Sequence, residues 1–288
     1  GIGARKQKAA RGRCCCRLRP PEGRALGIGV VLSGEKGRAV RDRPPCQVGL
    51  NWEVTSDQRW IILGANGAGK TSLLDMAAGW DVPSSGQVTV LDEDLSTADP
   101  EWLRPRVGYA SSSMSKRIPP TETVSDAVIT AAYAAAERRG EQFEDLDIRR
   151  ARRVLAEWRL ESLSDRTLVS LSEGEAKRMQ IARSIMTDPE LLLLDEPTAG
   201  LDLGSREEIM QMLGYFAGNP TAPAIIMVTH HVEEIPRGFT HVLLVKDGGA
   251  AYAGPIASTL TSENLTDVFG VKVTVYNNDG RYSAQASL

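Results

Sequence analysis

The clearest pattern in this chain is a set of short apolar runs separated by longer segments of mixed polarity. Four of these runs are long enough for strands, and they lie in residues 60–63, 190–195, 224–229 and 241–246. A strand that is apolar at nearly every position is typical of a parallel sheet with both faces covered. Residues 48–54 alternate between apolar and polar, which predicts a half-buried strand. Further strands are predicted at 87–91 and 106–110.

Helical patterns fill the segments between the predicted strands. They cover residues 72–78, 124–139, 147–158, 172–187, 205–216 and 262–269. Thr121 and Thr123 are candidate N-caps for the second helix, which is rich in alanine. Strands alternating with helices predict an α/β fold, into which the helices of 124–158 are inserted as a block. Two short strands are predicted to follow the last helix, joined by a turn at 277–280.

A glycine-rich loop follows the first apolar run and precedes the first helix. It reads G-A-N-G-A-G-K-T over residues 64–71, which matches the phosphate-binding pattern G-x-x-x-x-G-K-[ST] in its strand–loop–helix context. Glycines let backbone N–H groups turn toward a triphosphate, and the helix N-terminus adds positive partial charge. Lys70 is expected to reach the β- and γ-phosphates, and Thr71 to ligate Mg²⁺. The predicted nucleotide-binding residues here are Gly64, Ala65, Asn66, Gly67, Ala68, Gly69, Lys70, Thr71 and Ser72.

Two acidic residues end the four-leucine strand. Asp195 closes it and Glu196 follows directly. A doubly wound sheet binds ligands at the carboxyl ends of its strands, so both carboxylates are placed near a bound triphosphate. Asp195 is predicted to hold the Mg²⁺ shell and Glu196 to orient or deprotonate the attacking water.

Composition and charge narrow the class of protein. Of 288 residues 42% are hydrophobic and 25% charged, as in soluble globular proteins, and no apolar stretch approaches the roughly 20 residues of a membrane span. Residues 1–44 hold twelve Lys or Arg against three acidic residues, but no aromatic residue to stack on bases. We therefore expect a disordered arm over residues 1–45 and no nucleic-acid partner. All four cysteines lie in or beside this arm, and the cysteine-free remainder fits a reducing cytoplasm.

Three further motifs lie near the last strands. Residues 170–175 read S-L-S-E-G-E, residues 197–202 read P-T-A-G-L-D, and residues 228–231 read V-T-H-H. With the glycine-rich loop and the Asp195–Glu196 pair, this order resembles the ATP-binding cassette (ABC) ATPases. The resemblance implies a RecA-like P-loop NTPase core with an antiparallel β subdomain. It also implies a helical subdomain inserted at about 113–171, within a cassette over 46–270 that a short extension, 271–288, follows.

The resemblance also assigns roles to residues. It implies a head-to-tail dimer, formed with a second copy or a paired cassette, that encloses two ATP molecules. Ser172 and Gly174 would contact the γ-phosphate held by the other subunit, and Asp202 would lie at the dimer seam. His230 would reach the γ-phosphate, which makes Glu196, His230 and Lys70 the predicted catalytic residues and Thr71 and Asp195 the metal ligands. His231 is expected to be a surface neighbour.

Three departures from the family pattern bear on these roles. The loop after residues 106–110 usually carries a glutamine that senses the γ-phosphate, and Ser112 stands near that position. Glu173 and Glu175 replace the commoner glycine and glutamine of the signature, so their charge would weaken triphosphate binding unless both side chains point away. The residue that stacks on adenine is not evident, because only Val40 or Arg41 lies near the expected position.

The leading hypothesis is the ATP-hydrolysing subunit of an ABC transporter, and residues 261–270 resemble the end of prokaryotic importer ATPases. It would work with separate membrane-spanning subunits, in the cytoplasm and peripheral to the inner face of the cell membrane. The loop at 111–120 and the helical block would form the docking face. The alternative is a soluble ABC-type ATPase acting on nucleic acid or ribosomes, although such proteins usually carry two cassettes or a long coiled-coil insertion. A nucleotide-binding regulator that never hydrolyses conflicts with an intact Glu196.

Overall fold

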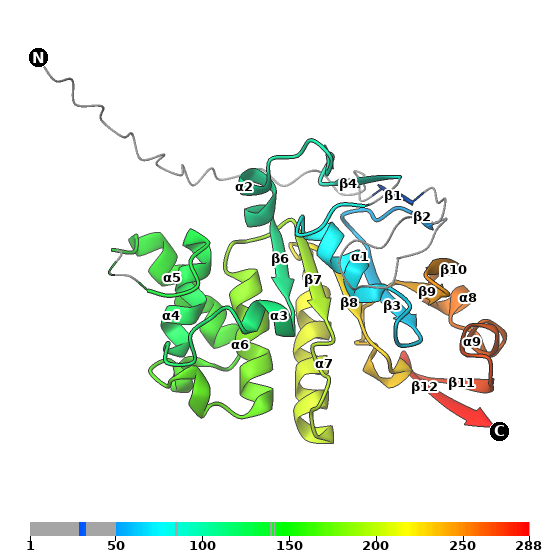
Figure 1. Ribbon diagram of the computed structural model, residues 1–288. Helices are drawn as coiled ribbons and strands as arrows, with labels where there is room; N and C mark the ends of the chain where they lie inside the picture. The colour runs from blue at the N-terminus through cyan, green and yellow to red at the C-terminus, as the bar shows by residue number, and fades with distance from the viewer. Residues whose placement is uncertain (1–28, 33–49, 84–85, 139, 141, 288) are drawn as a thin grey trace, which may run out of the picture.

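A six-stranded sheet lies at the centre of the protein (Figure 1), whose computed structural model describes residues 29–32, 50–83, 86–138, 140 and 142–287. The strand order is β10-β9-β3-β8-β7-β6, in which β10 is antiparallel to β9 and the other neighbours are parallel. The strands are β3 (Arg59–Gly64), β6 (Val107–Ala110), β7 (Leu191–Asp195), β8 (Ala224–Val228), β9 (His241–Lys246) and β10 (Gly249–Pro255). The apolar runs thus form the parallel strands, and the predicted α/β fold is confirmed.

Both faces of this sheet are buried, and successive residues of one strand enter different cores. In β3, Ile61 and Leu63 join the core on the side of α6 and α7, whereas Trp60 and Ile62 join the core on the side of α1. These helices are α1 (Lys70–Ala77), α6 (Glu173–Ile185) and α7 (Leu203–Ala217). Residues 60–63 of the strand are therefore all apolar, because each face is covered.

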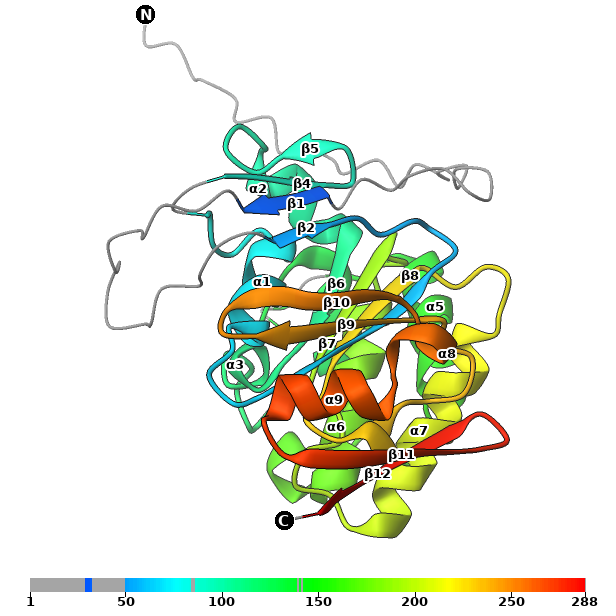
Figure 2. The same cartoon turned by 90° about the vertical axis from the view of Figure 1, so that its right-hand side faces the viewer.

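A smaller antiparallel sheet, in the order β2-β1-β4-β5, lies beside the main one (Figure 2). Its strands are β1 (Gly29–Leu32), β2 (Leu50–Trp52), β4 (Gln87–Val90) and β5 (Glu93–Asp94). Strand β1 corrects the expectation of a disordered arm over 1–45, because it pairs with β2 on one edge and with β4 on the other. Its G-V-V-L sequence is a short β-branched run that favours a strand once two neighbours supply hydrogen bonds. The remainder of that arm lies outside the described residues.

The helical block consists of α3 (Ser112–Ser115), α4 (Val124–Ile129), the 3₁₀ turn η2 (Thr130–Tyr133) and α5 (Asp145–Glu157). The predicted helix over 124–139 is too long, because the chain leaves it at Ala134, whose φ is +53°. The Tyr133 hydroxyl donates to Asp147 of α5 over 2.6 Å, so a tertiary contact outweighs the helix propensity of the alanines.

A half-buried arginine ties this block to α6. Arg183 donates to the backbone oxygen of Ala127, to Thr130 Oγ1 over 3.0 Å and to the backbone oxygen of Ala135 over 2.6 Å. Burial lowers the pKa of Arg183 to about 10. The inserted helices are therefore fastened to the helix that begins at the signature motif.

The chain ends in the predicted hairpin, which follows α8 (Ile256–Thr259) and α9 (Ser262–Phe269). Its strands are β11 (Lys272–Asn278) and β12 (Arg281–Ser287). Arg281 donates to Glu207 of α7 over 2.8 Å and to the backbone oxygen of Glu233, whose side chain accepts the N–H of Ala284. Glu233 belongs to the 3₁₀ turn η5 (Val232–Glu234), so the hairpin lies against the segment that follows His230.

Candidate functional site

The glycine-rich loop joins β3 to α1 in the conformation that its glycines permit. Gly67 and Gly69 have φ values of +78° and +88°, and Gly69 is the N-cap of α1. A Cβ on Gly64 would lie 2.3 Å from the backbone oxygen of Val245. Side chains are thus excluded at residue 64 by close packing and disfavoured at 67 and 69 by the left-handed backbone.

Lys70 lies at the first position of α1 with its ammonium turned back onto the loop. Its Nζ donates to the backbone oxygens of Gly64 and Ala65 over 2.8 and 2.9 Å. Burial lowers the pKa of Lys70, and the carboxylates of Glu196 and Asp195 oppose this shift. The nearby carboxylates therefore keep a buried cation at the mouth of the loop, as phosphate binding requires.

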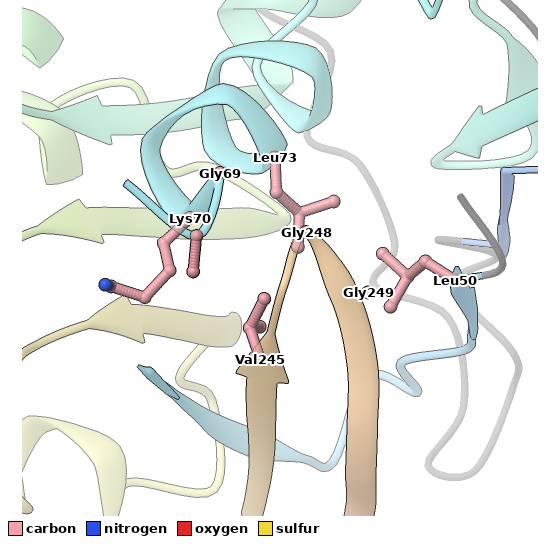
Figure 3. A pocket seen from close by; sticks show the side chains of 8 residues that line it. Leu50, Gly69, Lys70, Leu73, Val245, Gly248 and Gly249 are labelled. Atoms are coloured by element: carbon pink, nitrogen blue, oxygen red, sulfur yellow. The ribbon is translucent and has the colours of Figure 1, made fainter. Parts of the chain in front are cut away.

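A small hollow lies beside the loop (Figure 3). Its lining is Leu50, Ala68, Gly69, Lys70, Leu73, Val245, Gly248 and Gly249. Apart from Lys70, these described residues are aliphatic or glycine, so a base placed here would meet no aromatic ring. Val40 and Arg41, the two positions considered for stacking on adenine, lie outside the described residues.

The two predicted metal ligands come together from different elements. Thr71 Oγ1 donates to Asp195 Oδ1 over 3.4 Å, so the start of α1 meets the end of β7. Burial and the neighbouring Glu196 raise the pKa of Asp195, whereas the Thr71 hydroxyl lowers it. A hydroxyl and a carboxylate are the oxygen donors that Mg²⁺ prefers, and a Mg²⁺ ion bound with a triphosphate needs only one or two ligands from the protein. The pair therefore fits a magnesium ion.

Glu196 and His230 are in direct contact at the ends of neighbouring strands. His230 Nε2 meets Glu196 Oε1 just beyond β8 and β7. Glu196 has a left-handed backbone with a φ of +49°, and its N–H donates to the backbone oxygen of Val228 over 3.1 Å. The backbone oxygen of Glu196 accepts a hydrogen bond from Lys177 Nζ over 2.9 Å. Lys177 was not predicted as a site residue.

The signature motif begins α6, and both of its glutamates are engaged within the chain. Ser172 is the N-cap, and Glu175 completes a capping box by accepting the N–H of Ser172 over 2.7 Å. This hydrogen bond lowers the pKa of Glu175. Glu173 lies against Gly200, where an added Cβ would come within 2.6 Å of its carboxylate. Both carboxylates therefore have contacts within their own chain, and their effect on triphosphate binding stays a prediction.

The remaining predicted positions, Asp202 and Ser112, lie at the starts of helices. Asp202 is the N-cap of α7 and accepts the N–H and hydroxyl of Ser205 over 3.0 and 2.8 Å, which lowers the pKa of Asp202. Among the described residues, no hydrogen bond joins Ser172 or Asp202 to the glycine-rich loop of the same chain. Ser112 is exposed at the start of α3, whereas the adjacent Ser111 is buried and accepts the N–H of Met114.

The sequence did not predict several residues that form hydrogen bonds next to the predicted site residues. Glu234 is buried and accepts the hydroxyl of Thr229, which in turn accepts the N–H of His231 over 3.1 Å. Tyr109 donates to Asp75 over 2.9 Å. The available signals were weak, since a charged residue inside a helical pattern or just after a strand indicates burial only when its spatial neighbours are known.

Comparison with known proteins places this site in a family. The family model described as "ABC transporter" matches residues 48–199. An ABC transporter ATP-binding protein of Lactococcus lactis, YmeB, is 34% identical over 253 residues, which cover 88% of this chain and 97% of the relative. Another, YlmA of Bacillus subtilis, is 34% identical over 236 residues and covers 81% and 88%, respectively.

Solved structures agree with this assignment. An inward-facing metal-chelate type ABC transporter is 25% identical with a TM-score of 0.64, over 83% of this chain and 88% of that one. The cbiO1 cassette of Clostridium perfringens has the same fold, with 24% identity and a TM-score of 0.68 over 84% and 93%. No helix in the described part of the chain is long and apolar enough to span a membrane. The chain therefore belongs to the ATP-binding cassette family, as an ATP-hydrolysing subunit of an ABC transporter.

Proposed function

We propose that this chain hydrolyses magnesium-bound ATP at a site shared by two cassettes, with Glu196 as the general base. The observation that carries the proposal is the contact between Glu196 and His230, beside the Thr71–Asp195 pair and the Lys70 ammonium. A base, a metal-binding pair and a phosphate-binding cation thus converge at one edge of the sheet. General-base catalysis contributes about 10²–10⁴-fold to such reactions.

Each side chain has a distinct part in this scheme. Thr71 and Asp195 would hold Mg²⁺, which when bound neutralises negative charge on the phosphates. Lys70 would leave its two backbone acceptors and reach the phosphates. Glu196 would accept the proton of the attacking water, while His230 orients the carboxylate and donates toward the γ-phosphate. The Glu196–His230 contact supports these last two roles because it places both groups at one point.

The second half of the site would come from another cassette. Ser172 and Gly174 lie at the N-terminus of α6, where N–H groups and partial positive charge suit a phosphate oxygen. Ser172 and Asp202 have no hydrogen bond to the glycine-rich loop of their own chain among the described residues, which favours a role toward a second copy or a paired cassette. Asp202 would then lie at the seam.

Separate membrane-spanning subunits would complete the transporter, with this chain on the cytoplasmic side of the membrane. The face around the loop 111–120 supports such docking. On it the exposed Trp80 stacks with Arg104 and Arg117, and the distances from guanidinium carbon to ring centre are 3.8 and 4.2 Å. Relatives are named for hemin import and for Nod factor export, so their names assign neither cargo nor direction to this chain.

The decisive variant is Glu196→Gln, which keeps the shape of the side chain but removes the base. We expect the steady-state ATPase rate to fall at least 100-fold, while Mg-ATP shifts the variant to a dimer in size-exclusion chromatography with light scattering. Glu157→Gln is the matched control, because Glu157 is exposed and forms a surface pair with Arg153. Retained turnover, or a monomer in saturating Mg-ATP, would contradict the proposal. Recovery of ribosomes rather than membrane subunits in a pull-down would favour the alternative function.

A further inference from the structure

Lys177 is a buried cation that the scheme above leaves without a role. It lies one turn into α6, is 8% exposed, and donates from Nζ to the backbone oxygen of Glu196 over 2.9 Å. Four carboxylates attract its ammonium electrostatically, and they belong to Glu173, Glu196, Asp195 and Glu234. A lysine is rarely buried unless it has partners, so this position needs an explanation.

The conformation of Glu196 supplies that explanation. Its φ of +49° is uncommon for a residue with a side chain. The next residue, Pro197, favours an extended backbone at the position before it, which opposes this conformation further. Two hydrogen bonds hold the strained residue, since its N–H donates to Val228 of β8 and its C=O accepts from Lys177. The same backbone presents the carboxylate to His230.

Lys177 also connects this residue to the signature motif. Ser172 caps α6, and Glu173 lies one turn before Lys177, an i,i+4 spacing at which opposite charges attract. The carboxylate of Glu173 lies against Gly200, in the loop that leads from Glu196 to α7. One helical turn therefore carries both the signature and the donor that holds the base.

We propose that Lys177 is a positioning residue that holds Glu196 in its left-handed conformation and links it to the signature helix. This inference rests on the proposed function, in which the signature contacts the nucleotide bound by the opposite cassette. When the signature of one cassette contacts the nucleotide of the other, a shift of α6 would move Lys177. Because Lys177 holds Glu196 of its own cassette, the shift would also move that general base. The two composite sites would then be coupled through Lys177.

The test compares Lys177→Met, which keeps the length but removes the donors, with Lys177→Arg, which restores them. We expect Lys177→Met to lower kcat at least 10-fold while KM for ATP changes less than 3-fold, and Lys177→Arg to recover part of kcat. The Hill coefficient for ATP should fall toward 1 in the Met variant. Arg178→Met is the control, because Arg178 follows on the same helix but pairs with Glu208 away from Glu196.

Three results would overturn the inference. They are a kcat for Lys177→Met within 2-fold of the unsubstituted protein, an equal loss of ATP binding and turnover, or no recovery with Arg. A Hill coefficient that stays unchanged would overturn the coupling. If the Met variant fails to fold, Lys177→Gln takes its place with the same criteria. Failure of the proposed function itself is distinguishable, because the unsubstituted protein would then lack an ATPase rate that depends on Lys70.

Discussion

Replacing Arg183 by methionine should loosen the helical block from the rest of the cassette. The guanidinium joins α6 to the backbone oxygens of Ala127 and Ala135 and to the hydroxyl of Thr130. Methionine keeps the apolar stem but has no donor, so three charge-assisted hydrogen bonds are lost together. Each such bond contributes about 1.5–3 kcal/mol.

The net loss should be smaller than the sum of the three bonds. The Thr130 hydroxyl also donates to the backbone oxygens of Asp126 and Ala127, so Thr130 and Ala127 each keep a hydrogen-bond partner when Arg183 is replaced. We therefore expect the free energy of unfolding to fall by about 3 kcal/mol, which is near the upper end of the usual effect of a point substitution. At about 2–4 °C for each kcal/mol, the melting temperature should fall by roughly 6–12 °C.

Thermal and urea unfolding measure this change directly, and hydrogen exchange locates it. Protection should fall first at the amides of α4 and η2, because the acceptors Ala127 and Thr130 lie in these two elements. Arg153→Met is the control, since Arg153 forms an exposed i,i+4 pair with Glu157 and should change stability by less than about 0.5 kcal/mol. A loss below about 1 kcal/mol for Arg183→Met, or unchanged protection of α4, would refute this reasoning.

Three further predictions test other parts of the chain. Gly64→Ala should abolish Mg-ATP binding in calorimetry, because its Cβ would meet the Val245 oxygen at 2.3 Å; retained affinity would show that the loop adapts. In Glu175→Gln, the melting temperature should decrease less on acidification than it does in the unsubstituted protein. The hydrogen bond from Ser172 lowers the pKa of Glu175 below its ordinary 4.5, so the carboxylate stabilises the fold above pH 4.5 and this contribution disappears as pH falls through the lowered value; parallel melting curves would contradict it. Arg281→Ala should reduce kcat several-fold by releasing the hairpin from η5, with KM unchanged; equal ATPase rates would exclude that effect.

Much of the fold follows from local patterns. The four-leucine strand and the run at 60–63 could be predicted because their sequences are continuously apolar. They are apolar because both faces of the central sheet are covered. The helix predicted from 124 ran too far, since the left-handed Ala134 and the Tyr133–Asp147 contact are tertiary effects. Strand β1 was missed because its four residues gain their neighbours from distant parts of the chain.

Some residues of the site could likewise be predicted from the sequence, and others could not. Lys70, Thr71 and Asp195 could be named in advance because their motifs set residue types at fixed spacings, and the structure brings them together. Glu196 and His230 were each named in advance as catalytic residues, whereas the contact between them was not predicted. Lys177 could not be found, because its importance depends on a backbone oxygen that lies nineteen positions away in sequence. The left-handed conformation of Glu196 could not be predicted from the sequence either, because this conformation is usually adopted by glycine.

The hairpin that rests on η5 has a practical consequence for experiments on this protein. Arg281 and Ala284 fix β12 beside the segment that follows His230. A fluorescent amino acid introduced at the exposed Ser283 would therefore sense movements of that segment during turnover.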